Sequence, residues 1–264
     1  GGVIGDLVGF AAATVRRGVQ FAQIPTSLLA QVDSSIGGKT GINVSFGKNL
    51  VGAFHQPAVV IADTEALETL PHRDFLSGYG EVAKYGLLGD EKFFGWLEEN
   101  AASLIDGDVE LRMEAIKRSC QIKAKIVEND EREYGERALL NLGHTFCHAL
   151  EAVTNFSDIL LHGEGVSIGC NLAFELSSRL GLCSQEVPSR VREHYHSINV
   201  ATDISQINGF VANAEQIYDS MAQDKKVLNG VIRFILASDI GKAMVQENID
   251  KALVLEVLQQ SLER

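Results

Sequence analysis

The chain has 264 residues, of which 45% are hydrophobic and 22% are charged, so it is long enough to bury a full core in one large or two moderate domains. Its net charge of −12 argues against general nucleic-acid binding, which needs a basic surface, while an anionic small molecule can still bind in a local basic pocket. The four cysteines lack C-x-x-C spacing, and no apolar stretch reaches the roughly 18 residues that cross a bilayer. We therefore expect a soluble, cytoplasmic protein without a disulfide framework.

The chain begins with a glycine-rich stretch, residues 1–6, followed by apolar residues 7–13. This order predicts a turn that leads into a helix. Glycine allows close approach of the backbone to a phosphate, and a helix N-terminus offers N–H donors, so the turn is a candidate phosphate site. An ordinary strand-to-helix turn accounts for the same residues equally well.

Residues 19–24, which end before Pro25, and residues 59–62 are typical of short strands, so this part of the chain is predicted to be α/β. Between them, residues 33–43 and 47–49 are polar, rich in glycine and contain Lys39 and Lys48. Lysine beside such backbone suits recognition of phosphate or carboxylate. The G-x-x-x-x-G-K-[ST] spacing of a P-loop is absent because Asp33 occupies the place of its first glycine, which argues against a nucleoside triphosphatase.

After Pro71 the pattern changes to helical periodicity, including residues 93–97, 111–127 and 166–180. Glu81 and Lys84 are three residues apart on one predicted helix face, so a carboxylate and an ammonium can serve one pocket. For an isolated pair of this kind, the more common alternative is an ion pair on the surface, worth about 0.3–0.5 kcal/mol.

Three histidines follow in the second half of the chain. His144 and His148 lie one helical turn apart, and His162 comes from a later segment. Positions i and i+4 share a helix face, so this spacing is compatible with a catalytic metal that keeps an open coordination position. Three unrelated histidines, two of them inside a helical core, remain an equal alternative.

Five motifs in order, at residues 29–43, 47–54, 80–86, 141–151 and 162–164, resemble the 3-dehydroquinate synthase family. The resemblance implies an incomplete α/β nucleotide-binding portion followed by an all-α metal-binding domain. We expect residues 1–70 to be the C-terminal part of an NAD-binding domain and residues 71–264 to be a helical metal- and substrate-binding domain. The family has further strands before the glycine-rich stretch, so the chain is expected to be truncated at its N-terminus.

The same resemblance implies an NAD- and metal-dependent enzyme of the shikimate pathway. It would convert 3-deoxy-D-arabino-heptulosonate 7-phosphate to 3-dehydroquinate and phosphate. The family oxidises a ring hydroxyl with NAD, eliminates phosphate, reduces the ketone, opens the pyranose and closes the carbocycle by an aldol reaction. NAD is regenerated in each turnover, and the metal is zinc or cobalt.

Carried over to this sequence, the resemblance implies that Glu81, His144 and His162 bind the metal and that His148 is a substrate contact or an acid/base group. The i, i+4 spacing alone would have placed both His144 and His148 on the metal. The residues implied to bind the substrate's phosphate and carboxylate are Lys39, Lys48, Asn49, Lys84, Lys123, Arg137, Asn141 and one of Lys225 or Lys226. The residues implied to contact NAD are Gly2, Val3, Ile4, Gly5, Asp6, Thr26, Ser27, Asp33, Lys39, Lys48, Ala66, Leu67, Glu68 and Thr69.

Three alternatives stay open at this point. Related sugar phosphate cyclases share the metal set but make other carbocycles, and metal-dependent alcohol dehydrogenases of related fold are more distant rivals. A noncatalytic, truncated zinc-binding remnant is an alternative of a different class. The family resemblance also implies a homodimer and a small-molecule substrate. The acidic net charge and the lack of a long apolar stretch lead us to expect no nucleic-acid or membrane partner.

Overall fold

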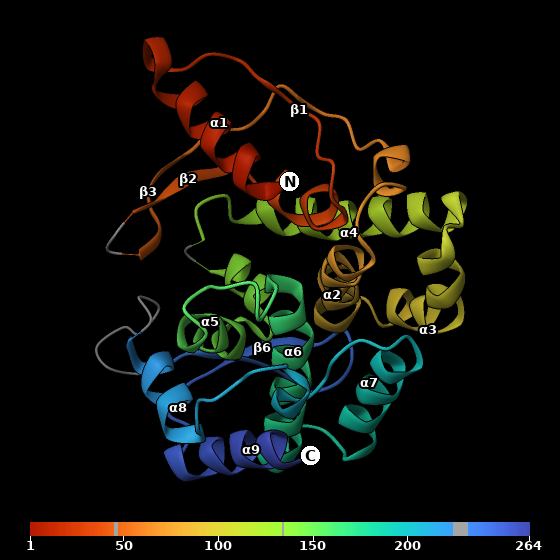
Figure 1. Cartoon of the computed structure of the whole chain (residues 1–264), viewed down its shortest axis with the longest axis vertical. Helices are drawn as coiled ribbons and strands as arrows, with labels where there is room; N and C mark the ends of the chain where they lie inside the picture. The colour runs from red at the N-terminus through yellow and green to blue at the C-terminus, as the bar shows by residue number, and fades with distance from the viewer. Residues whose placement is uncertain (45–46, 134, 224–231) are drawn as a thin grey trace. The chain divides into compact units, whose positions relative to one another are not determined.

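The computed structural model describes residues 1–44, 47–133, 135–223 and 232–264, with the side chains of residues 45–49 excepted (Figure 1). The chain divides into two compact units. The N-terminal unit comprises Gly1–Val82 and Ala102–Arg137, and the C-terminal unit comprises Ala83–Ala101 and Ala138–Arg264. The domain boundary predicted at residue 70 stays a prediction. None of the helices in the described ranges has the length and apolar character needed to cross a membrane.

Short strands and one long helix form the first part of the N-terminal unit. Strand β1 (Ala22–Gln23) pairs in parallel with β4 (Val59–Val60), at the two places where the sequence predicts strands. Strands β2 (Lys39–Val44) and β3 (Gly47–Phe54) form an antiparallel pair, and α1 (Gly2–Thr14) packs on β2. This part of the chain therefore contains both helix and strands, while the nucleotide-binding portion expected here stays a prediction.

The predicted glycine turn is wrong in its placement, because α1 already begins at Gly2. Neither Gly2 nor Gly5 has a positive φ, so a turn conformation is not what these glycines provide. The missing side chain matters instead. A Cβ at Gly5 would lie 2.3 Å from Nε2 of Gln23 in β1, so glycine leaves room for the end of this side chain beside the helix.

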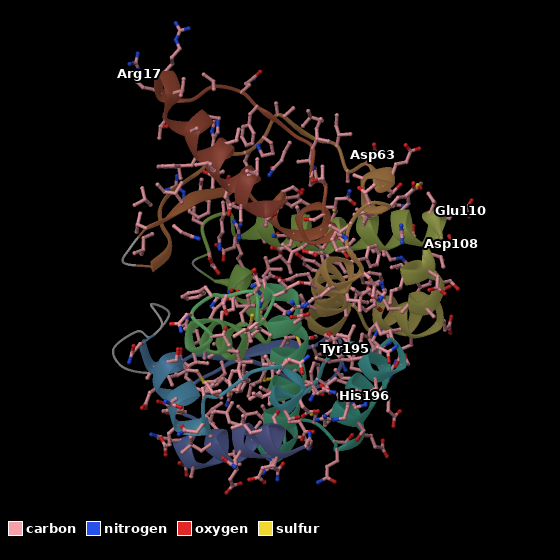
Figure 2. The ribbon with its side chains drawn as sticks, in the orientation of Figure 1. Arg17, Asp63, Asp108, Glu110, Tyr195 and His196 are labelled. Atoms are coloured by element: carbon pink, nitrogen blue, oxygen red, sulfur yellow. The ribbon has the colours of Figure 1, made fainter. Side chains whose placement is uncertain are left out.

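Helix α4 (Val109–Asn129) completes the N-terminal unit. Asp108 caps it, since its carboxylate accepts a hydrogen bond from the Leu111 backbone N–H at 3.0 Å; Figure 2 labels Asp108 at the start of this helix. Lys123 lies on the buried face of α4, among apolar residues. The unit also contains short helical turns at Val15–Arg17 (η1), Ala30–Ser34 (η2) and Thr64–Leu67 (η3).

Helices α2 (His72–Gly89) and α3 (Glu91–Asp106) are divided between the two units. Helix α2 begins immediately after Pro71, where the sequence predicts the change to helical structure. Proline has no backbone N–H. The first N–H groups of a helix have no partner within the helix, so a proline at this end removes no hydrogen bond. The predicted helical segment at residues 93–97 lies within α3.

The C-terminal unit is built around α6 (His162–Arg179), which packs against α5 (His144–Val153); both are drawn in green in Figure 1. The predicted helical segments at residues 111–127 and 166–180 correspond to α4 and α6. The remaining elements of the unit are η4 (Glu136–Asn141, shared with the N-terminal unit), α7 (Glu186–Ser197), η5 (Ile204–Gln206), α8 (Ala214–Gln223), β5 (Phe234–Ala237), β6 (Ala243–Gln246) and α9 (Lys251–Glu263).

The antiparallel pair of β5 and β6 corrects the expectation of an all-α second part. All four residues of β5 are buried, and the strand packs on α6. A short apolar run of this kind has no helical or alternating period that would distinguish a buried strand from a buried helix. The second part is therefore mainly helical, with one two-stranded sheet among the described residues.

Candidate active site

Two of the predicted histidines meet at the first residues of α5 and α6. His144 opens α5, and the preceding Gly143 has a φ of +77°, a conformation that favours glycine. A Cβ at Gly143 would lie 2.5 Å from the backbone nitrogen of Cys170 in α6, so the missing side chain lets the two helices come close. Because α6 opens at His162, its ring reaches that of His144, with the ring centroids 5.4 Å apart.

His148 completes a cluster of three imidazole rings. Its ring centroid lies 5.4 Å from that of His144, one helical turn earlier, and 6.5 Å from that of His162. All three residues belong to the C-terminal unit. The alternative of three unrelated histidines is therefore wrong. The cluster alone does not distinguish the rings that bind a metal from one that contacts substrate.

Hydrogen bonds at Nδ1 define which ring nitrogens can bind a cation. Nδ1 of His144 lies 3.2 Å from the backbone oxygen of Leu142, and Nδ1 of His162 lies 3.3 Å from Oε1 of Glu151. Both partners are acceptors, so each ring carries its hydrogen on Nδ1 and its lone pair on Nε2. Two neutral imidazoles that offer Nε2 are the donor chemistry that suits zinc or cobalt.

Glu81 and Lys84, which belong to the motif at residues 80–86, both lie in α2. Glu81 is fully buried and Lys84 is 1% exposed. An ion pair on a solvated helix surface, the common alternative for this spacing, is therefore wrong. Lys84 also lies over the ring of Tyr85, with Nζ 5.2 Å from the ring centroid. Ionisable groups are rarely buried at this depth without a partner or a function.

Sequence reasoning gave no role to Glu151 and Cys147, which lie beside His162. The ligand atoms of these three residues are all within 4.8 Å of one another. A signal for this was present, because positions 144, 147, 148 and 151 repeat at three, four and seven residues and share one face of a helix. Glu164, in the motif at residues 162–164, also has no role implied by the sequence; its carboxylate accepts a hydrogen bond from the Leu161 N–H at 2.9 Å and so stabilises the start of α6.

In the N-terminal unit, three predicted ligand-binding residues form a charged group. Nζ of Lys123 donates to the carboxylate of Asp33 at 2.7 Å and to its backbone oxygen at 2.6 Å. Burial, and secondly the negative charge of Asp33, raise the pKa of the Asp6 carboxyl to about 6. Residues predicted to bind cofactor (Asp6, Asp33) and substrate (Lys123) are thus neighbours within one unit.

Two cavities in the N-terminal unit are lined by predicted cofactor residues. One of about 410 Å³ includes Asp6 and Lys39 in its lining. A second, of about 320 Å³, is lined in part by Ile4, Gly5 and Thr26. The beginning of α1 and the segment after β1, which are distant in sequence, therefore contribute to one cavity, as expected if both contact the same ligand.

Arg137 and Lys39 contact other parts of the same unit. The Arg137 guanidinium donates to the Gly37 backbone oxygen at 2.9 Å, and its burial lowers the pKa of this side chain. Gly37 has a φ of +99°, and a Cβ there would lie 2.5 Å from Nη2 of Arg137. Lys39, which is half exposed, forms an ion pair with Glu133.

The remaining predicted residues are less informative. Asn141 donates to the Ala138 backbone oxygen at 3.1 Å. Ser27 accepts from the Ala30 N–H at 3.4 Å, and residues 66–69 lie at the end of η3 with Leu67 buried. The side chains of Lys48 and Asn49, and all of Lys225 and Lys226, lie outside the described residues.

Comparison with known families covers most of the chain. A family model described as 3-dehydroquinate synthase N-terminal matches residues 1–77, and one described as 3-dehydroquinate synthase C-terminal matches residues 78–227. A 3-dehydroquinate synthase of Ruegeria sp. (strain TM1040) is 67% identical over 262 residues, which cover 99% of this chain and 70% of the relative. A 3-dehydroquinate synthase of Jannaschia sp. (strain CCS1) is 63% identical, with 99% and 71% covered.

Solved structures of related enzymes have the same fold. The 2-epi-5-epi-valiolone synthase of Streptomyces hygroscopicus subsp. jinggangensis 5008, solved with NAD⁺ and Zn²⁺ bound, is 28% identical with a TM-score of 0.90 and covers 100% of this chain and 72% of its own. A 2-deoxy-scyllo-inosose synthase complexed with carbaglucose-6-phosphate, NAD⁺ and Co²⁺ is 26% identical with a TM-score of 0.89, and the match covers 98% and 72%. Both are sugar phosphate cyclases.

Proposed function

Because this chain belongs to the 3-dehydroquinate synthase family, we propose that it converts 3-deoxy-D-arabino-heptulosonate 7-phosphate to 3-dehydroquinate and phosphate. The observation that carries this assignment is the 67% identity to a curated 3-dehydroquinate synthase across 99% of the chain. The related cyclases of other product class reach only 28% and 26% identity. The enzyme is a phosphate-eliminating lyase that uses NAD and a divalent metal.

We assign the metal to Glu81, His144 and His162. Support for the two histidines comes from their adjacent rings and from Nδ1 contacts that direct the lone pair to Nε2. Support for Glu81 comes from the burial of a carboxylate on α2 and from the motif in which it stands. One acidic and two imidazole ligands leave positions for substrate oxygens, as in catalytic zinc sites.

NAD, when bound, takes up and returns the hydride, and the metal polarises the oxygen at the carbon that is oxidised. The residues of this chain bind and orient the substrate around that step. His148, beside His144, is the proposed proton donor and acceptor for substrate oxygens. Lys84, Lys123 and Arg137, all buried, are proposed to hold the phosphate and carboxylate, because cations exert a stronger field on an anion away from solvent.

The N-terminal unit is proposed to bind NAD through the residues that line its cavities. Ile4, Gly5 and Thr26 line one cavity, and Asp6 lines the other. Asp33 is held by Lys123, which fixes the position of its carboxylate. The homodimer remains a prediction from the family resemblance, and the cytoplasmic location remains a prediction from the cysteine pattern and the lack of a long apolar stretch.

Metal content and phosphate release test the assignment together. Purified protein is expected to hold about one zinc or cobalt per chain, and His162→Ala, His144→Ala or Glu81→Ala should each remove it, because two remaining ligands bind such an ion weakly. His72→Ala replaces an exposed histidine outside the cluster and should keep the metal. Metal content is measured by elemental analysis after dialysis against a weak chelator.

Phosphate release from the seven-carbon acid phosphate should require added NAD and be lost in the three ligand variants. Unchanged metal content in His162→Ala would contradict the ligand assignment, and phosphate release by cofactor-stripped protein would contradict the redox step. Faster turnover of a sugar phosphate that lacks the carboxylate would move the assignment to another sugar phosphate cyclase. If the purified protein holds metal but turns over none of these substrates, the result would favour the noncatalytic remnant.

A further inference from the structure

Glu151 lies at the end of α5, seven residues after His144 and on the same face of the helix. It is 5% exposed, and its Oε1 lies 3.3 Å from Nδ1 of His162. The fully buried Cys147, one turn earlier in α5, donates its thiol hydrogen to the His162 backbone oxygen at 3.4 Å. Its sulfur also lies 3.8 Å from Nδ1 of the same ring.

The packing of α5 on α6 holds this arrangement in place. A Cβ at Gly165 in α6 would lie 2.8 Å from Sγ of Cys147, so the cysteine fits only because glycine occupies that position. Cys147 thereby holds the backbone of His162, while Glu151 contacts its ring. Two separate contacts from one helix fix both the position and the rotation of the imidazole.

The chemistry of the acceptor determines which nitrogen is left for a cation. An ionised carboxylate can only accept a hydrogen bond, so its partner Nδ1 must carry the hydrogen and Nε2 keeps the lone pair. Loss of such a carboxylate partner typically costs 10- to 100-fold in metal affinity.

We propose that Glu151 is a positioning residue for the metal, which directs Nε2 of His162 toward the ion while Cys147 fixes the backbone of that histidine. This inference rests on the metal site of the proposed function. For His144, the acceptor for Nδ1 is the Leu142 backbone oxygen at 3.2 Å. The two imidazoles therefore differ, because a substitution can remove the acceptor of His162 but not that of His144.

Cys147, Glu151 and His162 together also form a group that could itself bind a metal. In that case Nδ1 of His162 would be a ligand and the thiolate of Cys147 would bind the ion directly. Cobalt distinguishes the two arrangements, since a cobalt–thiolate bond gives an intense charge-transfer absorption that nitrogen and oxygen ligands do not give. The proposal requires that this absorption be absent.

The experiment measures Zn²⁺ and Co²⁺ affinity by chelator competition in three variants of the full chain. Glu151→Gln keeps the length and an acceptor oxygen and should stay within about threefold of wild type. Glu151→Asp keeps the charge but withdraws it by one methylene, and Glu151→Leu removes the acceptor; both should weaken binding about 10- to 100-fold. The cobalt d–d spectrum should change in these two variants. Glu175→Gln, which alters a glutamate paired with Arg192 in the same unit, should bind as wild type.

The pattern across the variants decides the matter even if Glu151→Leu fails to fold. Wild-type affinity in Glu151→Asp, or a loss in Glu151→Gln as large as that in Glu151→Asp, would overturn the positioning role. A thiolate charge-transfer absorption that disappears in Cys147→Ser would overturn it in favour of a Cys147-containing site. Wild-type metal affinity in His162→Ala would contradict the metal site of the proposed function. Loss of metal binding in His162→Ala, with wild-type affinity in the Glu151 variants, would contradict only the positioning role.

Discussion

The central helix of the C-terminal unit and the first helix of the N-terminal unit bury very different fractions of their residues. Helix α6 buries 13 of its 18 residues. Helix α1 has the more apolar sequence, yet only Gly9 and Ala12 of its 13 residues are buried, and Val3, Ile4, Leu7 and Val8 are exposed. Apolar composition thus does not determine burial; burial also requires a surface that packs against each face of the helix.

The same difference separates the two groups of predicted site residues. The histidine cluster lies where α5 and α6 pack around glycines, and His144 is only 9% exposed. The predicted cofactor residues at the start of α1 and after β1 are partly or fully exposed, as Val3 and Thr26 illustrate. We therefore expect the metal-binding region to be sensitive to packing and the cofactor-binding region to be sensitive to charge.

The largest expected effect is the loss of the close helix contact in the C-terminal unit. Gly143→Ala places a Cβ 2.5 Å from the Cys170 nitrogen at a φ of +77°, and should destabilise the protein by about 4 kcal/mol through strain and overpacking. Gly181→Ala is the matched control, because its φ of +72° is similar but nothing lies within 4 Å of the new Cβ. It should cost about 1 kcal/mol. Urea unfolding measures both, and equal losses would show that helix packing is not the cause.

Acid should weaken the C-terminal unit through His194. This side chain is 4% exposed and packs edge-on against Phe94, and its burial lowers the pKa to about 4. The unfolded chain therefore binds the proton more tightly, and stability is lost as the pH falls from 6.5 to about 4, by roughly 3 kcal/mol. His194→Phe should remove this part of the pH dependence. Hydrogen exchange of α6 and α7, followed between pH 7 and 4, measures it; an identical acid response in the variant would contradict the assignment.

A smaller effect of opposite sign is expected in the N-terminal unit. The pKa of Asp6 is raised to about 6, so the folded state holds the proton longer than the unfolded chain, and stability falls as the pH rises from about 4 to 6. Because the carboxyl is partly exposed, solvent screening reduces the expected change to about 1 kcal/mol. Asp6→Asn should be flat over this range. Hydrogen exchange of α1 and β2 tests this, and a fall in their protection on acidification from pH 6 to 4 would refute the sign.

Much of the site was predictable because it consists of residue types in local motifs. The change to helix after Pro71, the strands near residues 22 and 59, and the closeness of His144 to His148 follow from periodicity or spacing over a few residues, whereas only the family resemblance grouped His162 with them. The errors arose where neighbours distant in sequence decide. Glycines that signal a turn lie within helix α1, which packs on β2, and β5 is a strand whose buried residues pair with β6.

By itself, the sequence determined which chemical groups the protein has and the family to which it belongs, because residue identity and order are preserved in motifs. Only the tertiary structure decided that Nδ1 of His162 faces Glu151, that Asp33 is held by Lys123, and that Glu81 and Lys84 are buried. The physical reason is that hydrogen bonds and burial depend on atoms brought together by helix packing. Such contacts join residues 11 and 90 positions apart in these two hydrogen bonds, beyond the reach of any local pattern.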